Sequence, residues 1–198
     1  MLRYRKYIVF FLVFIIGVVL DQLTKWWIVA NVEFTKEEIE VIPGFLSVVH
    51  AQNPGAAMGL LRNYEHRHYL FLVFTLIALA VIVDLFRRLP RTDVFMSLVL
   101  GLILSGAIGN GIDRLHKGTV TDFIRVYTDL PSLKVWLINT FGTNEWPSFN
   151  IADSALVVGV GLFLIHYMFL EEKETDEGME LPPAAEPKDI PADENVAS

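Results

Sequence analysis

The sequence predicts an all-α membrane protein built on a four-transmembrane-helix bundle. Hydrophobic residues make up 53% of the 198 positions, and the mean hydropathy of +0.45 is high for a soluble protein. These residues are gathered into four blocks, each close to the roughly 20 residues that a helix needs to cross a bilayer. Ionisable residues interrupt the blocks mainly near one end, which points to a function at one face of the membrane.

The first block could instead be a cleavable signal peptide, because basic residues precede its apolar stretch. Against that alternative, Asp21, Lys25, Trp26 and Trp27 stand where a small-residue cleavage site would lie. We therefore expect an uncleaved membrane helix. The four predicted spans cover residues 8–29, 69–86, 94–112 and 151–170.

Basic residues in the short flanking segments predict the orientation of the bundle. They occur before the first span and in the link between the second and third spans: Arg3, Arg5, Lys6, Arg87, Arg88 and Arg91. With four spans, these two segments lie on the same side of the membrane, which we expect to be the cytoplasm. Both termini then lie there, and the longer segments 30–68 and 113–150 face outward.

Charge separates a four-span domain, residues 1–170, from an acidic tail, residues 171–198. The tail holds ten acidic and two basic residues, a net charge of −8, whereas the whole chain carries −7. Few large apolar residues occur in the tail, so we expect a disordered cytoplasmic segment. The chain has no cysteine, which excludes disulfides, thiolate metal ligands and a thiol nucleophile. We expect no nucleic-acid partner.

Polar residues that are unusual in a membrane segment gather at the outer ends of the spans. Ionisable groups in that position are costly unless they are paired, so they are candidates for function. Asp21 and Lys25, four residues apart on one helix, share a face, and we interpret them as a structural ion pair. The full set is Asp21, Lys25, Asn110, Asp113, Arg114, Asn150 and Asp153, with Asn53 and Asp122 in the outer segments.

Asp122 and Asp153 are far apart in sequence, yet the topology brings both to the outer ends of neighbouring spans. Two carboxylates in close contact cannot both ionise cheaply, so such a pair holds one proton. One can then deprotonate a water while the other donates a hydrogen bond to a scissile carbonyl. Asn110, Asn150 and Arg114 could orient the pair or stabilise negative charge. The alternative is that Asp153 only caps a helix and Asp122 only ends a strand.

Short apolar runs in the outer segments predict a small sheet. Residues 45–49 and 58–61 flank a turn at residues 53–57, where proline and glycine break regular structure. Residues 118–124 alternate between polar and apolar side chains and could join them.

Other chemistries fit the sequence less well. A metalloprotease needs spaced ligands, but His66 and His68 read as an exposed loop pair, and we expect neither metal nor cofactor. A serine protease based on Ser105 or Ser154 with Lys25 lacks a nucleophile elbow. A transporter or proton channel predicts polar residues through the full membrane depth and an internal repeat, and neither is present. A purely structural bundle does not explain why polar residues converge on one rim.

Five motifs resemble those of the lipoprotein signal peptidases, the type II signal peptidases of bacteria, in the same order along residues 8–170. They are DQLTK (21–25), NPGAA (53–57), GAIGN with DR (106–110, 113–114), GTVTDF (118–123) and FNIADS (149–154). The resemblance implies a four-helix bundle with a small extracytoplasmic β-cradle and an interfacial helix, for which residues 61–68 are available. It also implies an intramembrane aspartyl endopeptidase that cleaves prolipoproteins before a cysteine carrying diacylglycerol.

By motif position, the resemblance implies that Asp122 and Asp153 form the catalytic dyad. Supporting positions around the active site are Asn110, Arg114, Asn150, Asp21, Lys25, Asn53, Gly106 and Asp113. The implied location is the bacterial cytoplasmic (inner) membrane, with the active site near the extracytoplasmic face and in contact with membrane lipids. Cyclic peptides such as globomycin are expected inhibitors. Because one chain contains a complete dyad, we expect a functional monomer.

Two features depart from the family pattern. Residues 123–149 form a longer outer segment than the family requires, and we interpret it as an extra element at the membrane surface. The acidic tail is also an extension.

Overall fold

The computed structural model describes residues 4–55 and 67–169. Four of its helices are long and apolar enough to cross a membrane, and a small antiparallel sheet accompanies them, as predicted. Along the chain the elements are α1 (Arg5–Asn31), β1 (Glu38–Ile42), β2 (Leu46–Asn53), α2 (Arg67–Arg88), α3 (Val94–Lys117), β3 (Val120–Val126), α4 (Pro131–Phe141) and α5 (Ile151–Phe169).

Some predicted features fall outside the described residues. They include the strand at 58–61, the loop histidine His66, residue 170 and the tail at 171–198. The interfacial helix expected at 61–68 lies largely outside as well, and its last two positions are the first residues of α2.

The third membrane helix is longer than its apolar run predicts. Hydropathy predicts an end near residue 112, but α3 continues to Lys117 and ends at Gly118, which adopts a left-handed conformation with φ +71°. The polar residues after position 112 continue the helix because none of them breaks it, whereas glycine readily takes the left-handed conformation that ends one. Asp113 and Arg114 therefore belong to the last turns of α3 rather than to the outer loop.

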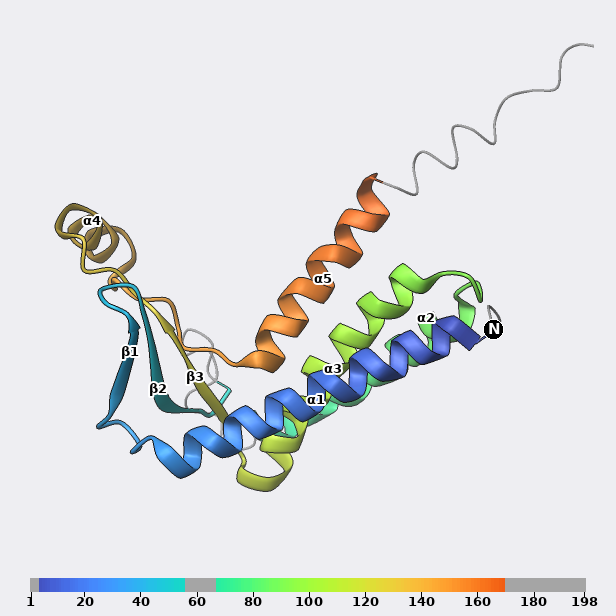
Figure 1. Cartoon of the computed structure of the whole chain (residues 1–198), viewed down its shortest axis with the longest axis horizontal. Helices are drawn as coiled ribbons and strands as arrows, with labels where there is room; N and C mark the ends of the chain where they lie inside the picture. The colour runs from blue at the N-terminus through green and yellow to red at the C-terminus, as the bar shows by residue number, and fades with distance from the viewer. Residues whose placement is uncertain (1–3, 56–66, 170–198) are drawn as a thin grey trace, which may run out of the picture. The chain divides into compact units, whose positions relative to one another are not determined.

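Helix α3 lies at the centre of the bundle, with α1 and α2 packed along it (Figure 1). Small residues allow α1 and α3 to approach closely. A Cβ atom added to Gly17 would lie 2.5 Å from Ser105 Oγ, and one added to Gly101 would lie 2.9 Å from the carbonyl oxygen of Phe10. The outer faces of α1 and α2 leave large apolar side chains exposed, as expected where lipid surrounds a protein.

The half of the bundle near the α2–α3 link has an apolar core. At its extreme end, the buried Lys6 ammonium donates hydrogen bonds to the carbonyl oxygens of Phe86 (3.0 Å) and Leu89 (2.8 Å). These carbonyls belong to the last turn of α2 and to the residue that follows it, where a cation is favoured by the helix dipole. The core cluster consists of Phe10, Ile82, Phe86, Leu100 and Leu104.

The three strands form an antiparallel sheet in the order β1-β2-β3. Strands β2 and β3 confirm the predicted pairing, with Leu46 opposite Val126 and Asn53 opposite Val120. Strand β1 was not predicted, because all five of its residues are exposed and carry no burial pattern. Side chains of Ile28, Val32 and Phe123 join the sheet to the end of α1 that lies opposite the apolar core.

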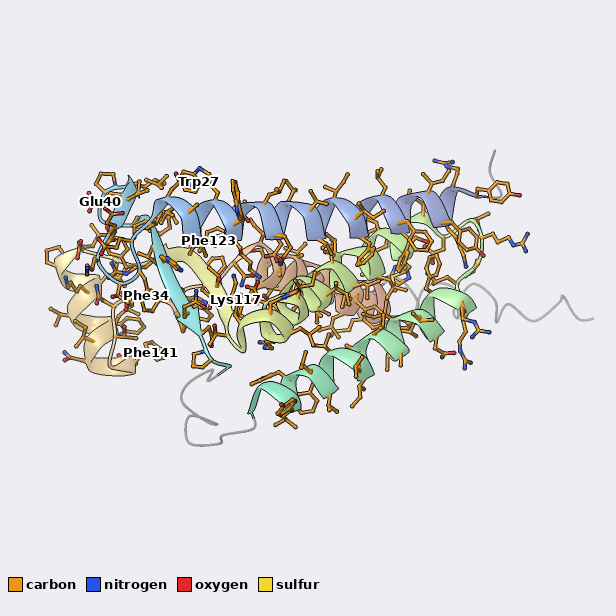
Figure 2. The ribbon with its side chains drawn as sticks, turned by 90° about the horizontal axis from the view of Figure 1, so that it is seen from below. Trp27, Phe34, Glu40, Lys117, Phe123 and Phe141 are labelled. Carbon is orange, nitrogen blue, oxygen red and sulfur yellow. The ribbon has the colours of Figure 1, made fainter. Side chains whose placement is uncertain are left out.

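Helix α4 is the extra element within residues 123–149. It begins with Pro131 in its first turn and ends at Gly142, and none of its residues is buried. In both views its axis runs across the direction of α1 rather than along it (Figures 1 and 2).

Candidate active site

Asp122 lies in β3, directly beyond the end of α3, and is only 2% exposed. Its two carboxylate oxygens accept hydrogen bonds from the side-chain amides of Asn150 (2.7 Å) and Asn53 (3.0 Å). Burial raises the pKa of Asp122 from 3.8 to about 7, and the nearby charge of Asp153 adds to the effect. The two amide hydrogen bonds oppose this rise but do not cancel it. Asp122 is therefore suited to hold a proton near neutral pH.

Asp153 occupies the first turn of α5 and forms a reciprocal cap with Asn150. The Asp153 backbone N–H donates to Asn150 Oδ1 (2.9 Å), and the Asn150 backbone N–H donates to Asp153 Oδ2 (3.2 Å). This arrangement satisfies backbone donors that a helix start leaves free. The other carboxylate oxygen of Asp153 accepts from Asn110 Nδ2 at 2.7 Å. Asp153 therefore both caps α5 and lies beside Asp122 in the site.

Two asparagine side chains connect the two aspartates. The Asn150 amide nitrogen that contacts Asp122 also lies 3.1 Å from Asn110 Oδ1. The Asn110 amide nitrogen in turn contacts Asp153, so the chain of hydrogen bonds runs Asp122–Asn150–Asn110–Asp153. Asn150 is fully buried and Asn110 is 4% exposed, which fixes both amides in place.

A buried ion cluster lies behind these amides. The Lys25 ammonium is 2.9 Å from Asp21, 3.3 Å from Asp113 and 3.0 Å from Asn110 Oδ1. The predicted Asp21–Lys25 pair is therefore present, and Asp113 joins it. Each acid also fixes a backbone: Asp113 accepts from the Thr121 N–H (2.9 Å), and Asp21 accepts from the Ala152 N–H (3.0 Å). The cluster positions the residues that immediately precede Asp122 and Asp153.

Gly106 and Gly109 let α3 approach the start of α5. A Cβ atom on Gly106 would lie 2.3 Å from the Ala152 carbonyl oxygen, and one on Gly109 would lie 2.6 Å from Asp21 Oδ2. Distances this short exclude any side chain unless the neighbour moves. The predicted Gly106 thus acts through backbone spacing.

Arg114 lies at the edge of the cluster. Its guanidinium is 4.7 Å from the centroid of the Phe71 ring, a cation–π contact between α3 and α2. The side chain is half-buried. Its positive charge interacts most strongly with Asp153, Asp122 and Asp113.

Comparison with known proteins agrees with this geometry. The sequence profile of the family described as Signal peptidase (SPase) II matches residues 13–169, which is most of the chain. The chain belongs to the signal peptidase II family. The match includes both aspartates and every supporting residue named above.

Similar members of this family are lipoprotein signal peptidases from several bacteria. That of Geobacter metallireducens is 36% identical over 172 residues, covering 87% of this chain and 98% of its own length. That of Symbiobacterium thermophilum is 38% identical over 161 residues, covering 81% and 95%. Two solved structures, both described as bacterial membrane enzymes, are similar in fold. They share 33% and 32% identity, have TM-scores of 0.66 and 0.67, and cover 81% and 87% of this chain and 92% and 93% of their own.

The two serines considered as nucleophiles in this family member both donate hydrogen bonds to nearby carbonyls. Ser105 Oγ donates to the Leu102 carbonyl (2.8 Å) and Ser154 Oγ to the Asn150 carbonyl (3.0 Å), both within or next to their own helices. Within residues 4–55 and 67–169, no group of three or more histidine, aspartate or glutamate residues could hold a metal ion.

Sequence reasoning did not identify Gln22 and Thr121 as parts of the site. Gln22 Nε2 donates to Asp21 (3.0 Å) and to the Gly109 carbonyl (3.1 Å), linking α1 with α3. Thr121 contributes its backbone: its N–H contacts Asp113 and its carbonyl accepts from Asn150 Nδ2 at 3.3 Å. Their only sequence signal is adjacency to Asp21 and Asp122 within the motifs.

Proposed function

We propose that this chain is an aspartyl endopeptidase that removes the signal peptide from diacylglyceryl-modified prolipoproteins, cleaving before the lipidated cysteine. Membership in the signal peptidase II family supports proteolysis of prolipoproteins. The observation that carries the aspartyl mechanism is the hydrogen-bonded chain Asp122–Asn150–Asn110–Asp153.

The two aspartates take different roles in the proposed reaction. Asp122, with a pKa of about 7, holds the shared proton and donates it to the scissile carbonyl oxygen. The Asp153 carboxylate accepts a proton from water as the water oxygen attacks the carbonyl carbon. The tetrahedral intermediate then collapses: the C–N bond breaks and the amine nitrogen takes the proton from Asp153. The hydroxyl returns a proton to Asp122, which regenerates the starting state.

The asparagines and the ion cluster hold the dyad in place for these steps. Asn150 and Asn110 donate to the carboxylates from buried positions, so they restrict rotation of Asp122 and Asp153 without supplying a charge. Lys25 donates to Asn110 Oδ1 and thereby fixes which way that amide faces. Arg114 supplies positive charge at the edge of the site, where negative charge develops on the substrate.

The membrane context is part of the proposal. The basic residues Arg87 and Arg88 at the end of α2 support a cytoplasmic position for the α2–α3 link. The dyad then lies near the extracytoplasmic face of the inner membrane, where a lipid-modified substrate enters from the surrounding lipid. One chain carries both aspartates, which supports a functional monomer. Globomycin-type cyclic peptides are proposed to compete with the substrate at the dyad.

The test is cleavage of a diacylglyceryl-modified prolipoprotein by the purified protein in detergent, followed as a mobility shift. We expect Asp122→Asn and Asp153→Asn each to lower the rate at least about a hundredfold, the usual scale of one general acid–base group. Asp84→Asn is the matched control, because the Asp84 carboxylate is exposed and forms an ion pair with Arg88, away from the two aspartates. Undiminished cleavage by either dyad variant would remove that aspartate from the mechanism.

A further inference from the structure

Helix α4 exposes large apolar side chains on several of its faces. None of its residues is buried, although six of its eleven positions are large and apolar. Trp136 and Phe141 contact each other edge to face with ring centroids 5.9 Å apart, and they remain 56% and 66% exposed. Exposed large hydrophobic residues on and beside the helix are Leu130, Leu133, Val135, Trp136, Ile138 and Phe141. A helix that is apolar on most faces normally has a partner or a lipid environment.

Both ends of α4 are fixed to the sheet. The Thr128 N–H donates to the Asn144 carbonyl (3.1 Å), and Asn144 Nδ2 donates back to the Thr128 carbonyl (2.9 Å). Just beyond, Glu145 pairs with the Arg125 guanidinium at 2.6 Å. The chain leaves β3, forms α4 and returns to β3, so these hydrogen bonds and the ion pair hold the helix in place relative to the sheet. Its exposure is therefore built into the fold.

Three observations identify lipid as the environment of this helix. The axis of α4 runs across the direction of α1 (Figures 1 and 2). Because α1 is a membrane-spanning helix, α4 then lies parallel to the membrane plane. The only charged side chain within α4, Lys134, is neutralised by Asp129 at 2.8 Å. Tryptophan is typical of the membrane–water interface, and α4 and the segment after it contribute Trp136 and Trp146.

The apolar surface is also continuous with the membrane-facing surface along the chain. Exposed apolar residues run from the spanning part of α1 through Trp26 and Trp27 to Phe34 and then to Ile39 and Val41 in β1. In Figure 2, Trp27 lies on the outside of α1, and Phe34 and Phe141 lie beyond the end of that helix. The residues 142–150 that follow α4 lead directly into α5, so the helix stays close to the point where the chain re-enters the membrane.

We propose that α4 is an interfacial helix that lies on the bilayer surface on the active-site side, with Trp136 and Phe141 inserted among the lipid headgroups and upper acyl chains. The helix holds the sheet that carries Asp122 at a fixed height above the lipid. Because its single charge is neutralised, the contact is apolar and does not require anionic lipid. Zwitterionic phosphatidylcholine is therefore a sufficient partner.

The test uses tryptophan fluorescence of the full chain in phosphatidylcholine vesicles with brominated acyl chains, which quench only tryptophans that reach them. The chain has four tryptophans, so Trp26, Trp27 and Trp146 are replaced by phenylalanine to leave Trp136. A second variant that retains only Trp27, on the spanning helix α1, gives the reference for lipid contact. The unfolding temperature of both variants in detergent, compared with that of the wild type, verifies that they are folded.

We expect Trp136 to lose most of its fluorescence intensity in brominated vesicles. Added salt should change this quenching little, because the contact is apolar. Quenching of Trp27 without quenching of Trp136 would overturn the proposal. The proposal would also be overturned if Trp136 is protected from quenching at a high protein-to-lipid ratio and loses this protection on dilution with lipid. That result would identify a second copy of the chain as the partner. In the variant that retains only Trp136, Phe141→Asp should lower the quenching of Trp136 by brominated lipid, whereas Asn139→Asp, on the same helix, should not. Because the readout is lipid contact, its failure is distinguishable from loss of the peptidase activity.

Discussion

The Asp21 carboxylate accepts a hydrogen bond from the Ala152 backbone N–H over 3.0 Å, although 131 residues separate the two positions. This contact ties α1 to the first turn of α5, one residue before Asp153. The same carboxylate forms the buried ion pair with Lys25. A single acidic side chain thus positions the backbone next to Asp153 and neutralises a buried cation.

Removing that acid should cost stability. In Asp21→Ala, Lys25 keeps only Asp113 as a charged partner, and breaking a buried pair typically costs about 3 to 5 kcal/mol. The measurement is denaturant or thermal unfolding in detergent. Asp84→Ala is the matched control, because Asp84 also has a basic partner four residues on, but that pair is exposed and worth about 1 kcal/mol or less. Equal destabilisation by the two variants would contradict a structural role for the buried pair.

Asp122→Asn should abolish cleavage and remove a pH-dependent loss of stability, although its amide can accept only one of the two hydrogen bonds from Asn150 and Asn53. The pKa of Asp122 is raised from 3.8 to about 7 in the folded state, so the folded protein binds a proton more tightly than the unfolded chain. Between these pKa values stability falls as the pH rises, and above about 7 the loss is complete. The full shift corresponds to on the order of 4 kcal/mol as an upper bound. An amide cannot ionise and avoids this loss.

The check on Asp122→Asn is unfolding of variant and wild type at pH 4 and at pH 8. The difference in free energy of unfolding should favour the variant more at pH 8. A difference that does not change with pH would show that Asp122 has an ordinary pKa. Asp84→Asn should show no such pH-dependent gain, because Asp84 is exposed.

The basic limb of the pH–rate profile should move when Asn53 is replaced. In the proposed mechanism activity requires one proton on the Asp122–Asp153 pair, so it falls as Asp122 loses its proton above about pH 7. The Asn53 amide stabilises the ionised form of Asp122, so Asn53→Ala raises the pKa further. We expect the basic limb to shift to higher pH. Gln52→Ala is the control, because Gln52 contacts Thr119 and Thr121 rather than either aspartate; a shift in both variants would argue against the assignment.

Gly106→Ala should reduce activity strongly. The new methyl group would meet the Ala152 carbonyl oxygen at 2.3 Å, so α5 must move away from α3 and carry Asp153 away from Asn110. Gly161→Ala, in α5, is the control, because a Cβ atom there meets nothing within 4 Å. We expect Gly161→Ala to keep wild-type cleavage and unfolding temperature. Full activity of Gly106→Ala would show that the α3–α5 distance is not critical.

The four spans and the gathering of the two aspartates at one end of the bundle were predictable because hydropathy and charge are local properties of the sequence. The ion pair of Asp21 and Lys25 followed from helix periodicity alone. By contrast, the third partner, Asp113, depends on the continuation of α3 to Lys117, which hydropathy does not report.

The parts that escaped prediction depend on tertiary contacts. Strand β1 is wholly exposed and is defined by pairing with β2, so its sequence lacks the alternation of a half-buried strand. Helix α4 has apolar residues on several faces and lacks the periodicity of a helix packed on a core. The reciprocal cap of Asn150 and Asp153 was foreseen only as an alternative to catalysis, whereas the geometry allows both.

The apolar cluster of Phe10, Ile82, Phe86, Leu100 and Leu104 has a consequence for membrane permeability. A hydrolase embedded in a bilayer must admit water to its substrate without conducting protons or ions down their gradients. Here the charged and amide side chains of the candidate site lie at one end of the bundle. The opposite half contains aromatic and branched aliphatic side chains, where conduction of protons or ions would require polar groups. The apolar half of the described bundle therefore separates the two aspartates from the opposite face of a bilayer that the helices span.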